Sequence, residues 1–418
     1  METIWDVAII GAGPAGLAAA VAAKEAGAEK VVVIERDSAP GGILQQCIHP
    51  GFGLTKFNEE LTGPEYAGIY IDRAKELGVE FLLDTMVLSI AENEIYCVGK
   101  SIGCANIRAK SVILAMGCRE RTRGSLVIPG TRPAGIYTAG AAQRLLNRQG
   151  IMPGKRFVII GSGDIGMIMA RRLTLEGGKV EAVVELMSYT AGLTRNLVQC
   201  LNDFGIPLLT SHTVTNIIGR ERVEAVEIAE VDGSMKPIPG TERRIDCDTV
   251  LLSVGLIPEN ELSRALGIEL SPVTRGPKVN QFRQTNLPWV FACGNVTHVN
   301  DLADNVSMES ETAGRSAALY AKSGTLGAER TVATIPGKNV RYICPQTVCA
   351  GKGLEEASLY FRVTKPLRRG CITVRSGGEV LLTKKSPKLN PGEMAHVTLD
   401  SAMLERLSDD IMIEAEGE

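Results

Sequence analysis

Three glycines near the N-terminus have the spacing of a turn that binds a dinucleotide. Gly11, Gly13 and Gly16 follow an apolar run and precede an alanine-rich segment, so they would join a strand to a helix. The first glycine makes the tight turn, the second lets the backbone approach a pyrophosphate, and the third lets the helix lie close to the strand. Glu35 ends the next apolar run, where a carboxylate can accept hydrogen bonds from an adenosine ribose. The stretch 4–35 therefore predicts a pyrophosphate bound at a helix N-terminus.

The same pattern occurs a second time. Gly161, Gly163 and Gly166 follow another apolar run, and Glu185 stands 24 positions after the first glycine of its turn, as the acidic residue of the first pattern does. An internal repeat of this kind predicts two dinucleotide-binding units. The four residues after Glu185 include no Arg or Lys, which favours the 2′-hydroxyl of NAD over the 2′-phosphate of NADP.

Cys47 and His49 are the next pair that could do chemistry. They lie in a glycine-rich stretch, 41–53, that carries both a thiol and an imidazole. One interpretation is a reactive thiolate assisted by His49. The other is a packed cysteine beside a histidine that hydrogen-bonds the loop or the edge of a ligand. We favour the second interpretation, because a single thiol cannot form the intrachain disulfide that disulfide reductases need.

Cys344 and Cys349 have a spacing that resembles half of a metal site. No second pair of cysteines or histidines lies at a suitable distance in the sequence, so we predict no metal ion within this chain. A partner chain could complete such a site.

The composition limits the classes of function. The chain has 418 residues and a net charge of −3, which points neither to nucleic acid nor to an anionic membrane surface. No apolar run reaches transmembrane length, and the N-terminus shows no signal-peptide pattern. Ten cysteines are scattered without a disulfide-framework pattern, which is typical of a reducing cytoplasm. We therefore expect a cytoplasmic protein.

The fold class expected from these patterns is α/β. Short alternating stretches at 86–90 and 94–98 predict an antiparallel ribbon, and 303–322 predicts a helix whose small residues suit close packing. Residues 324–338 have a composition typical of a linker. Beyond it, short strands separated by Gly, Pro and Lys predict a small antiparallel sandwich without a catalytic motif, most simply a docking module.

The order of the motifs resembles the pyridine nucleotide-disulfide oxidoreductase superfamily. The motifs are Gly11–Gly16, Ser111–Gly117, Gly161–Gly166, Gly255–Pro258 and Phe291–Asn295. The resemblance implies two Rossmann-like domains, with an NAD domain inserted into an FAD domain. The expected domains are 1–118 and 283–325 for FAD, 119–282 for NAD, a linker at 326–338, and a C-terminal β domain at 339–418.

A tighter resemblance is to a subgroup of that superfamily without a redox disulfide. Its members are the FAD- and NAD-type subunits of hydrogen cyanide synthase, opine dehydrogenase and dye-linked proline dehydrogenase. The stretches 41–53 and 57–67 also resemble FAD-dependent oxidoreductases that accompany flavoproteins of the glycerol-3-phosphate or 2-hydroxyglutarate dehydrogenase kind.

The resemblance assigns residues to two cofactors. Those implied for FAD are Gly11, Gly13, Pro14, Ala15, Gly16, Glu35 and Arg36 at the ADP half, Gly42 and Ile43 near the flavin, Ala115 and Gly117 on the adenosine side, and Gly294 and Asn295 at the ribityl chain and pyrophosphate. Those implied for NAD are Gly161, Gly163, Asp164, Ile165, Gly166 and Glu185, with Gly255 nearby.

Two positions depart from the superfamily pattern. Asn295 stands where Asp is usual, so an acceptor remains for a ribityl hydroxyl but the charge is lost. Met116 stands where Thr is common. The polar residues after Asn295, namely His298, Asp301 and Asp304, would line the flavin pocket, form a subunit contact or simply make a polar loop over the cofactor.

The leading hypothesis is an FAD-dependent NAD(H) oxidoreductase that acts as an electron-transfer subunit. Another flavoprotein subunit, in a homo- or hetero-oligomer, would handle a small hydroxy acid, glycerol 3-phosphate or an amine. One alternative is a self-sufficient NADH oxidase or reductase that uses Cys47. Another is a structural or regulatory subunit with ATP or ADP in the second site.

Overall fold

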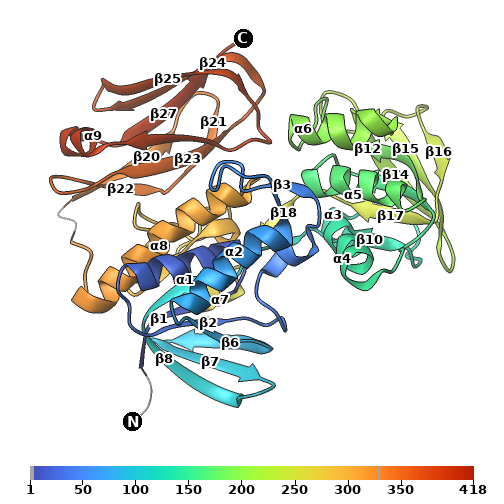
Figure 1. Ribbon diagram of the computed structural model, residues 1–418. Helices are drawn as coiled ribbons and strands as arrows, with labels where there is room; N and C mark the ends of the chain where they lie inside the picture. The colour runs from blue at the N-terminus through green and yellow to red at the C-terminus, as the bar shows by residue number, and fades with distance from the viewer. Residues whose placement is uncertain (1–3, 328–329) are drawn as a thin grey trace. The chain divides into compact units, whose positions relative to one another are not determined.

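The computed structural model describes residues 4–327 and 330–418, which form two compact units. The chain builds the first part of unit 1 up to Cys118, forms unit 2 over Arg119–Ile257, and returns to unit 1 for Pro258–Glu418. One unit is therefore inserted into the other, as the resemblance implies. The elements of both units are labelled in Figure 1.

The sheet of unit 1 forms around the first glycine pattern. Its parallel strands are β1 (Ile4–Ile10), β2 (Val31–Ile34), β5 (Glu80–Leu82), the C-terminal half of β8 (Gly103–Leu114) and β19 (Val290–Ala292). Every residue of the two apolar runs, Val7–Ile10 and Val31–Ile34, is buried, as is typical of strands inside a parallel sheet. The antiparallel ribbon β6 (Thr85–Ala91) and β7 (Glu94–Gly99) continues the sheet from β8, as predicted.

Three helices pack side by side in unit 1 (Figure 1): α1 (Pro14–Glu25), α2 (Gly63–Glu76) and α8 (Ala303–Ser323). Small residues bring α1 and α8 together. A Cβ on Gly314 of α8 would lie 2.1 Å from the carbonyl oxygen of Ala19, so the helix backbones approach closely at this point. The small-residue face predicted for 303–322 is thereby confirmed.

The parallel sheet of unit 2 runs β10 (Ile136–Thr138), β17 (Thr249–Leu252), β11 (Arg156–Ile160), β12 (Lys179–Val184) and β13 (Leu208–Leu209). Four of these strands, β13, β12, β11 and β17, repeat the order of β5, β2, β1 and β8 in unit 1. The helices α4 (Ala139–Gln149) and α5 (Asp164–Leu175) follow β10 and β11. A separate antiparallel sheet consists of β14 (His212–Gly219), β15 (Val223–Glu230) and β16 (Arg243–Asp246).

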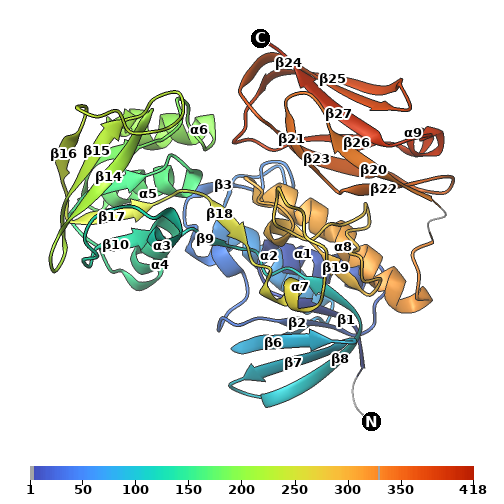
Figure 2. The same ribbon diagram turned by 180° about the vertical axis from the view of Figure 1, so that it is seen from behind.

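The C-terminal part of unit 1 is a two-sheet β domain (Figure 2). One sheet has the order β22 (Thr347–Ala350), β20 (Arg330–Pro336), β27 (Ile411–Glu416), β24 (Leu367–Ser376), β25 (Glu379–Leu389). The other has the order β21 (Val340–Cys344), β23 (Ala357–Val363), β26 (Ala395–Leu399), and α9 (Ser401–Arg406) follows β26. Side chains of both sheets share one hydrophobic core, so a sandwich forms, but β20 and β27 pair in parallel and the sandwich is not wholly antiparallel as predicted.

Two boundaries differ from those expected. The expected NAD domain ran to residue 282, but the compact unit ends at Ile257, and Ile268 and Val279 pack in a core of unit 1. The expected linker 326–338 contains β20, whose Val332 is buried and which pairs with β22 and β27. The C-terminal domain thus begins with β20 and not at 339. Residues 328–329 of the expected linker lie outside the described residues.

Short elements complete the chain. They are η1 (Gly42–Gln46), β3 (Pro50–Phe52), β4 (Leu61–Thr62), β9 (Cys118–Glu120), α3 (Arg123–Leu126), α6 (Thr194–Asn196), the π-helix η2 (Leu197–Leu201), η3 (Asn202–Phe204), β18 (Leu256–Pro258), α7 (Glu261–Ala265) and η4 (Gly294–Val296). Among the helices of the described chain, none is both long and apolar enough to cross a membrane.

Candidate functional site

The first glycine turn has the geometry that a bound pyrophosphate requires. Gly11 has φ +102°, and a Cβ there would lie 2.6 Å from the carbonyl oxygen of Ala115. A Cβ on Gly16 would lie 1.8 Å from the carbonyl oxygen of Gly11, so the helix and the turn exclude any side chain at that point. By contrast, a Cβ on Gly13 meets no described atom within 4 Å. Gly13 is the N-cap of α1 and Pro14 follows it, so an open space adjoins the helix N-terminus.

Two further glycines that were predicted to bind FAD lie close to this turn. A Cβ on Gly42 would lie 2.9 Å from Cα of Gly13, and a Cβ on Gly294 would lie 2.7 Å from Cβ of Ala15. Both glycines have positive φ, so both the approach and the backbone conformation favour glycine. Segments that are far apart in the sequence therefore converge on the N-terminus of α1.

Glu35 lies at the end of β2 and is buried. Its Oε2 accepts a hydrogen bond from the backbone N–H of Ala12 at 2.7 Å, and its Oε1 accepts one from Asp37 N–H at 2.8 Å. Each carboxylate oxygen has two lone pairs, so acceptor capacity remains for ribose hydroxyls. Arg36, which was also assigned to this site, is exposed.

Asn295 joins two loops of unit 1. Its Nδ2 donates to Sγ of Cys118 at 3.6 Å, just after Gly117 (φ +71°), and its Oδ1 accepts from Asn300 N–H at 2.9 Å. A carboxylate could accept from Asn300 but could not donate to the thiol sulfur. Asn295 thus contacts Cys118 and Asn300 through the two ends of its amide.

The second turn repeats the close approaches of the first turn in unit 2, but not the open space at its middle glycine. Gly161 has φ +90°, and a Cβ there would lie 2.2 Å from the carbonyl oxygen of Ser253. Gly166 N–H donates to Ser253 Oγ at 3.1 Å, and a Cβ on Gly163 would lie 2.9 Å from the same oxygen. Gly255 follows β17 with φ +97°. Ser253 thus closes this turn through its side chain as well as its backbone.

Glu185, like Glu35, accepts hydrogen bonds from backbone N–H groups through both of its carboxylate oxygens. Its Oε2 accepts from Ser162 N–H at 2.8 Å and from Ser162 Oγ at 2.6 Å, and its Oε1 accepts from Met187 N–H at 2.9 Å. The carboxylate is buried at the end of β12. The repeat seen in the sequence therefore extends to individual hydrogen bonds.

The first two residues of α5 position the helix. Asp164 Oδ1 accepts from Leu193 N–H and from Asn196 Nδ2, both at 2.7 Å. Ile165 packs against the core of unit 2. These contacts fix the N-terminus of α5 beside the loop that follows β12.

A cavity of about 310 Å³ opens in unit 2. Its lining includes Thr138 and Leu252, the last residues of β10 and β17. Ligands of open α/β sheets bind outside the carboxyl ends of the strands. Arg123 and Arg132 also line the cavity, which gives it positive charge suited to an anionic ligand.

The surroundings of Cys47, which is half-buried, oppose the thiolate interpretation. Its Sγ donates a hydrogen bond to the carbonyl oxygen of Ile43 at 3.3 Å, and burial raises the pKa of the thiol to about 12. His49 is partly exposed, and its Nδ1 lies 3.1 Å from the carbonyl oxygen of Pro50. The structure favours a protonated, packed thiol.

We therefore predict that the Cys47→Ser variant, loaded with FAD, retains NADH turnover within about a factor of two of the wild type, because a thiol that stays protonated at neutral pH is a poor nucleophile. Steady-state turnover with an artificial electron acceptor measures this. Loss of more than nine-tenths of the turnover, with FAD still bound, would show that Cys47 takes part in the reaction.

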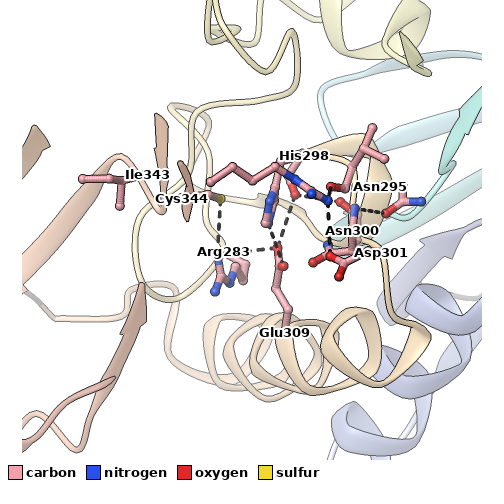
Figure 3. A network of polar contacts seen from close by, with 12 residues as sticks. Arg283, Asn295, His298, Asn300, Asp301, Glu309, Ile343 and Cys344 are labelled. Carbon is pink, nitrogen blue, oxygen red and sulfur yellow. Dashed lines mark hydrogen bonds and ion pairs between the residues drawn. The ribbon is translucent and has the colours of Figure 1, made fainter. Parts of the chain in front are cut away.

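A buried polar cluster lies beside the Asn295 loop (Figure 3). His298 Nε2 lies 2.9 Å from Oε2 of Glu309, and Arg283 Nη1 lies 3.5 Å from both Oε1 of Glu309 and Sγ of Cys344. Burial opposes the charge on Glu309, but Arg283 and His298 outweigh it and lower the pKa of this carboxyl to about 2. Burial also opposes the charge on His298, but Cys344 and Glu309 raise its pKa well above the usual value.

Three residues of the same cluster are of types that can bind a metal ion. One ligand atom each of His298, Glu309 and Cys344 lies within 4.8 Å of the other two. The Arg283 guanidinium already contacts two of the three residues and supplies the positive charge. A divalent ion would meet that fixed cation, so these residues do not fit a resident metal. Cys349 is held through its backbone, because its N–H donates a hydrogen bond to Oε1 of Gln281.

The other polar residues after Asn295 hold loops in unit 1. Asp304 accepts from the backbone N–H groups of Gly53 and Thr55 at 2.9 and 2.7 Å. Asp301 pairs with Arg362 of the C-terminal domain at 3.2 Å. Neither Arg283 nor Glu309 was predicted from the sequence as a site residue. For Glu309 a signal existed, because an acidic residue on the small-residue face of a predicted helix needs a buried partner.

The family model described as pyridine nucleotide-disulphide oxidoreductase matches residues 5–317. An opine oxidase subunit of Rhizobium meliloti is 27% identical over 302 residues, which is 68% of this chain and 64% of that protein. Thioredoxin reductase of Listeria innocua is 28% identical over 306 residues, which is 71% of this chain and 86% of that protein.

Solved structures agree on the fold. Thioredoxin reductase of T. acidophilum matches with a TM-score of 0.62 and 24% identity over 77% of this chain and 100% of that one. The chain spans only 53–64% of the opine oxidase subunits that it matches. The chain belongs to the pyridine nucleotide-disulphide oxidoreductase family, whose members are flavin-dependent oxidoreductases that bind FAD and NAD(P).

Proposed function

We propose that this chain is the FAD- and NAD(H)-binding electron-transfer subunit of a cytoplasmic, multi-subunit flavoprotein dehydrogenase. A partner flavoprotein subunit would oxidise a small hydroxy acid, glycerol 3-phosphate or an amine. The observation that carries the proposal is the pair of glycine turns, each closed by a buried carboxylate that accepts backbone N–H groups. The similarity to an opine oxidase protein that is named as one subunit of its enzyme supports the partner.

The residues of unit 1 fit FAD. The open space at Gly13, the positive φ of Gly42 and Gly294, and the remaining lone pairs of Glu35 suit a dinucleotide that lies along the N-terminus of α1. When bound, FAD supplies hydride and one-electron chemistry. The residues of the chain bind the pyrophosphate, orient the ribose and hold the loops that surround the site.

The residues of unit 2 favour NAD over NADP. Glu185 places a buried carboxylate where the adenosine ribose would lie, and the next two residues are apolar. A 2′-phosphate would meet a like charge there, whereas a 2′-hydroxyl can donate to the carboxylate.

Anaerobic titration of the FAD-loaded protein tests both parts of the proposal. NADH is expected to bleach the visible flavin band, and the concentration needed should be at least about tenfold lower than for NADPH, because repulsion of the phosphate by Glu185 costs on the order of 1.4 kcal/mol or more. A flavin band that stays unbleached by NADH, even with the partner subunit present, would remove the hydride role.

Two variants sharpen this titration. Glu185→Gln should bring the concentrations of NADH and NADPH that bleach the flavin band closer together, because the charge that repels the 2′-phosphate is lost. Glu181→Gln on the same strand removes a carboxylate that pairs with Arg156 at 2.8 Å and should leave the ratio of the two concentrations unchanged. Tighter binding of ADP or ATP than of NADH would instead indicate a regulatory nucleotide site.

A further inference from the structure

The side chain of Asn300 is a buried amide that has no hydrogen-bond partner within 4–327 and 330–418. Asn300 is 9% exposed, and neither its Nδ2 nor its Oδ1 has a hydrogen-bond partner among the described residues. A buried polar group left unpaired is unfavourable, and native proteins rarely keep one. An amide with both atoms unpaired therefore points to a ligand that supplies a donor and an acceptor.

The backbone around Asn300 is held from two sides. Asn300 N–H donates to Oδ1 of Asn295, the residue that the family resemblance places at the ribityl chain. From the C-terminal domain, Arg362 Nη2 donates to the carbonyl oxygen of Val299 at 3.1 Å and to Oδ1 of Asp301 at 3.2 Å. The residues on both sides of Asn300 are thus fixed by one arginine of β23.

Further contacts complete the support. Met394 N–H donates to Oδ1 of Asp301 at 3.1 Å. Two residues before Asn300, His298 is held by Glu309 in the buried cluster (Figure 3). The loop 297–301 is therefore attached to α8 and to the C-terminal β domain, which makes that domain part of the support of the loop and not only a docking module.

We propose that the Asn300 amide binds the polar edge of the flavin ring and that Arg362 is a positioning residue for it. The inference depends on the FAD site proposed above. The flavin ring carries an N–H donor beside carbonyl acceptors on one edge. A carboxamide carries a donor and an acceptor side by side, so it can satisfy that edge and be satisfied by it.

The Asn300→Leu variant tests this assignment in the full-length protein. In the FAD-free form its Tm should equal or exceed that of the wild type, because an unpaired buried amide is replaced by an apolar group of similar size. FAD should bind about tenfold more weakly, and the rise in Tm on adding FAD should shrink. The midpoint potential of the bound flavin should also change.

Asn300→Asp gives the direction of the change in potential. A carboxylate next to the ring disfavours the negative charge of reduced flavin, so the midpoint potential should fall below that of the wild type.

Arg362→Met should weaken FAD binding, as Asn300→Leu does, although Arg362 does not touch the cofactor in our proposal. Arg341→Met, at an exposed arginine of β21, is the matched control and should leave FAD binding unchanged.

The outcomes separate the inference from the proposed function. A wild-type chain that cannot be loaded with FAD overturns both. A loaded wild type whose affinity and potential are unchanged in Asn300→Leu overturns this inference alone. An equal loss of Tm with and without FAD would assign Asn300 a purely structural role, and a loss of affinity without a change in potential would remove its contact with the ring.

Discussion

Replacing Gly13 with alanine is expected to leave the fold intact and to weaken FAD binding by a factor on the order of 10 to 100. When FAD is bound, the added methyl group would be forced into the space of the pyrophosphate, and such overpacking costs about 1–3 kcal/mol. A Cβ at this position meets no described atom within 4 Å, and the backbone φ of −73° is open to alanine. The free protein therefore tolerates the methyl group. The bound pyrophosphate does not, since it must approach the backbone at this glycine.

Two other glycines give the comparison. Gly68 also has open space around an added Cβ but lies within α2, so Gly68→Ala should leave FAD binding unchanged and preserve or raise the Tm. In Gly16→Ala the Cβ would lie 1.8 Å from the carbonyl oxygen of Gly11, so the fold itself should be damaged. FAD content after purification, FAD titration and Tm measure all three. Wild-type FAD affinity in Gly13→Ala would contradict the pyrophosphate assignment.

Glu309→Gln is expected to lower the stability of the protein strongly. The carboxylate lies between Arg283 and His298, and its side chain is fully buried. Removing its charge leaves the Arg283 guanidinium buried against a neutral amide, and breaking a buried ion pair in this way costs about 3–5 kcal/mol. The midpoint of urea unfolding of the FAD-free protein measures the loss.

Glu311→Gln is the matched control on the same helix. Glu311 pairs with Lys56 at a partly exposed position, with 20% of its side chain accessible. Partly exposed pairs contribute about 0–1 kcal/mol, so this variant should shift the unfolding midpoint little. If the two variants lost the same stability, the cluster would not be the anchor that its burial indicates.

The pH dependence of stability follows from the same cluster. The pKa of Glu309 is lowered to about 2, so its contribution is present above the ordinary value of 4.5 and is lost as the pH falls from there toward 2. The pKa of His298 is raised, so its contribution is complete below about 6.5 and is lost as the pH rises through the folded value. In Glu309→Gln the first of these two dependences should disappear.

The two nucleotide turns could be predicted from the sequence because their determinants are local. Gly11, Gly16 and the helix that follows occupy consecutive positions, and the acidic residue stands at a fixed distance along the chain. The α/β class and the small-residue face of α8 followed from the same repeat and periodicity, whereas the insertion of one unit into another was implied by the family resemblance. The domain limits did not, because β20 resembles a linker until β22 and β27 pair with it.

The sequence by itself determined that two dinucleotide turns of the same length exist and that each has an acidic partner. Only the tertiary structure decided what surrounds them. Cys344 contacts Arg283, and Arg362 pairs with Asp301, each across 61 positions of the chain. Local spacing does not encode such contacts, because they depend on which sheets pack together and on the loss of water from between them.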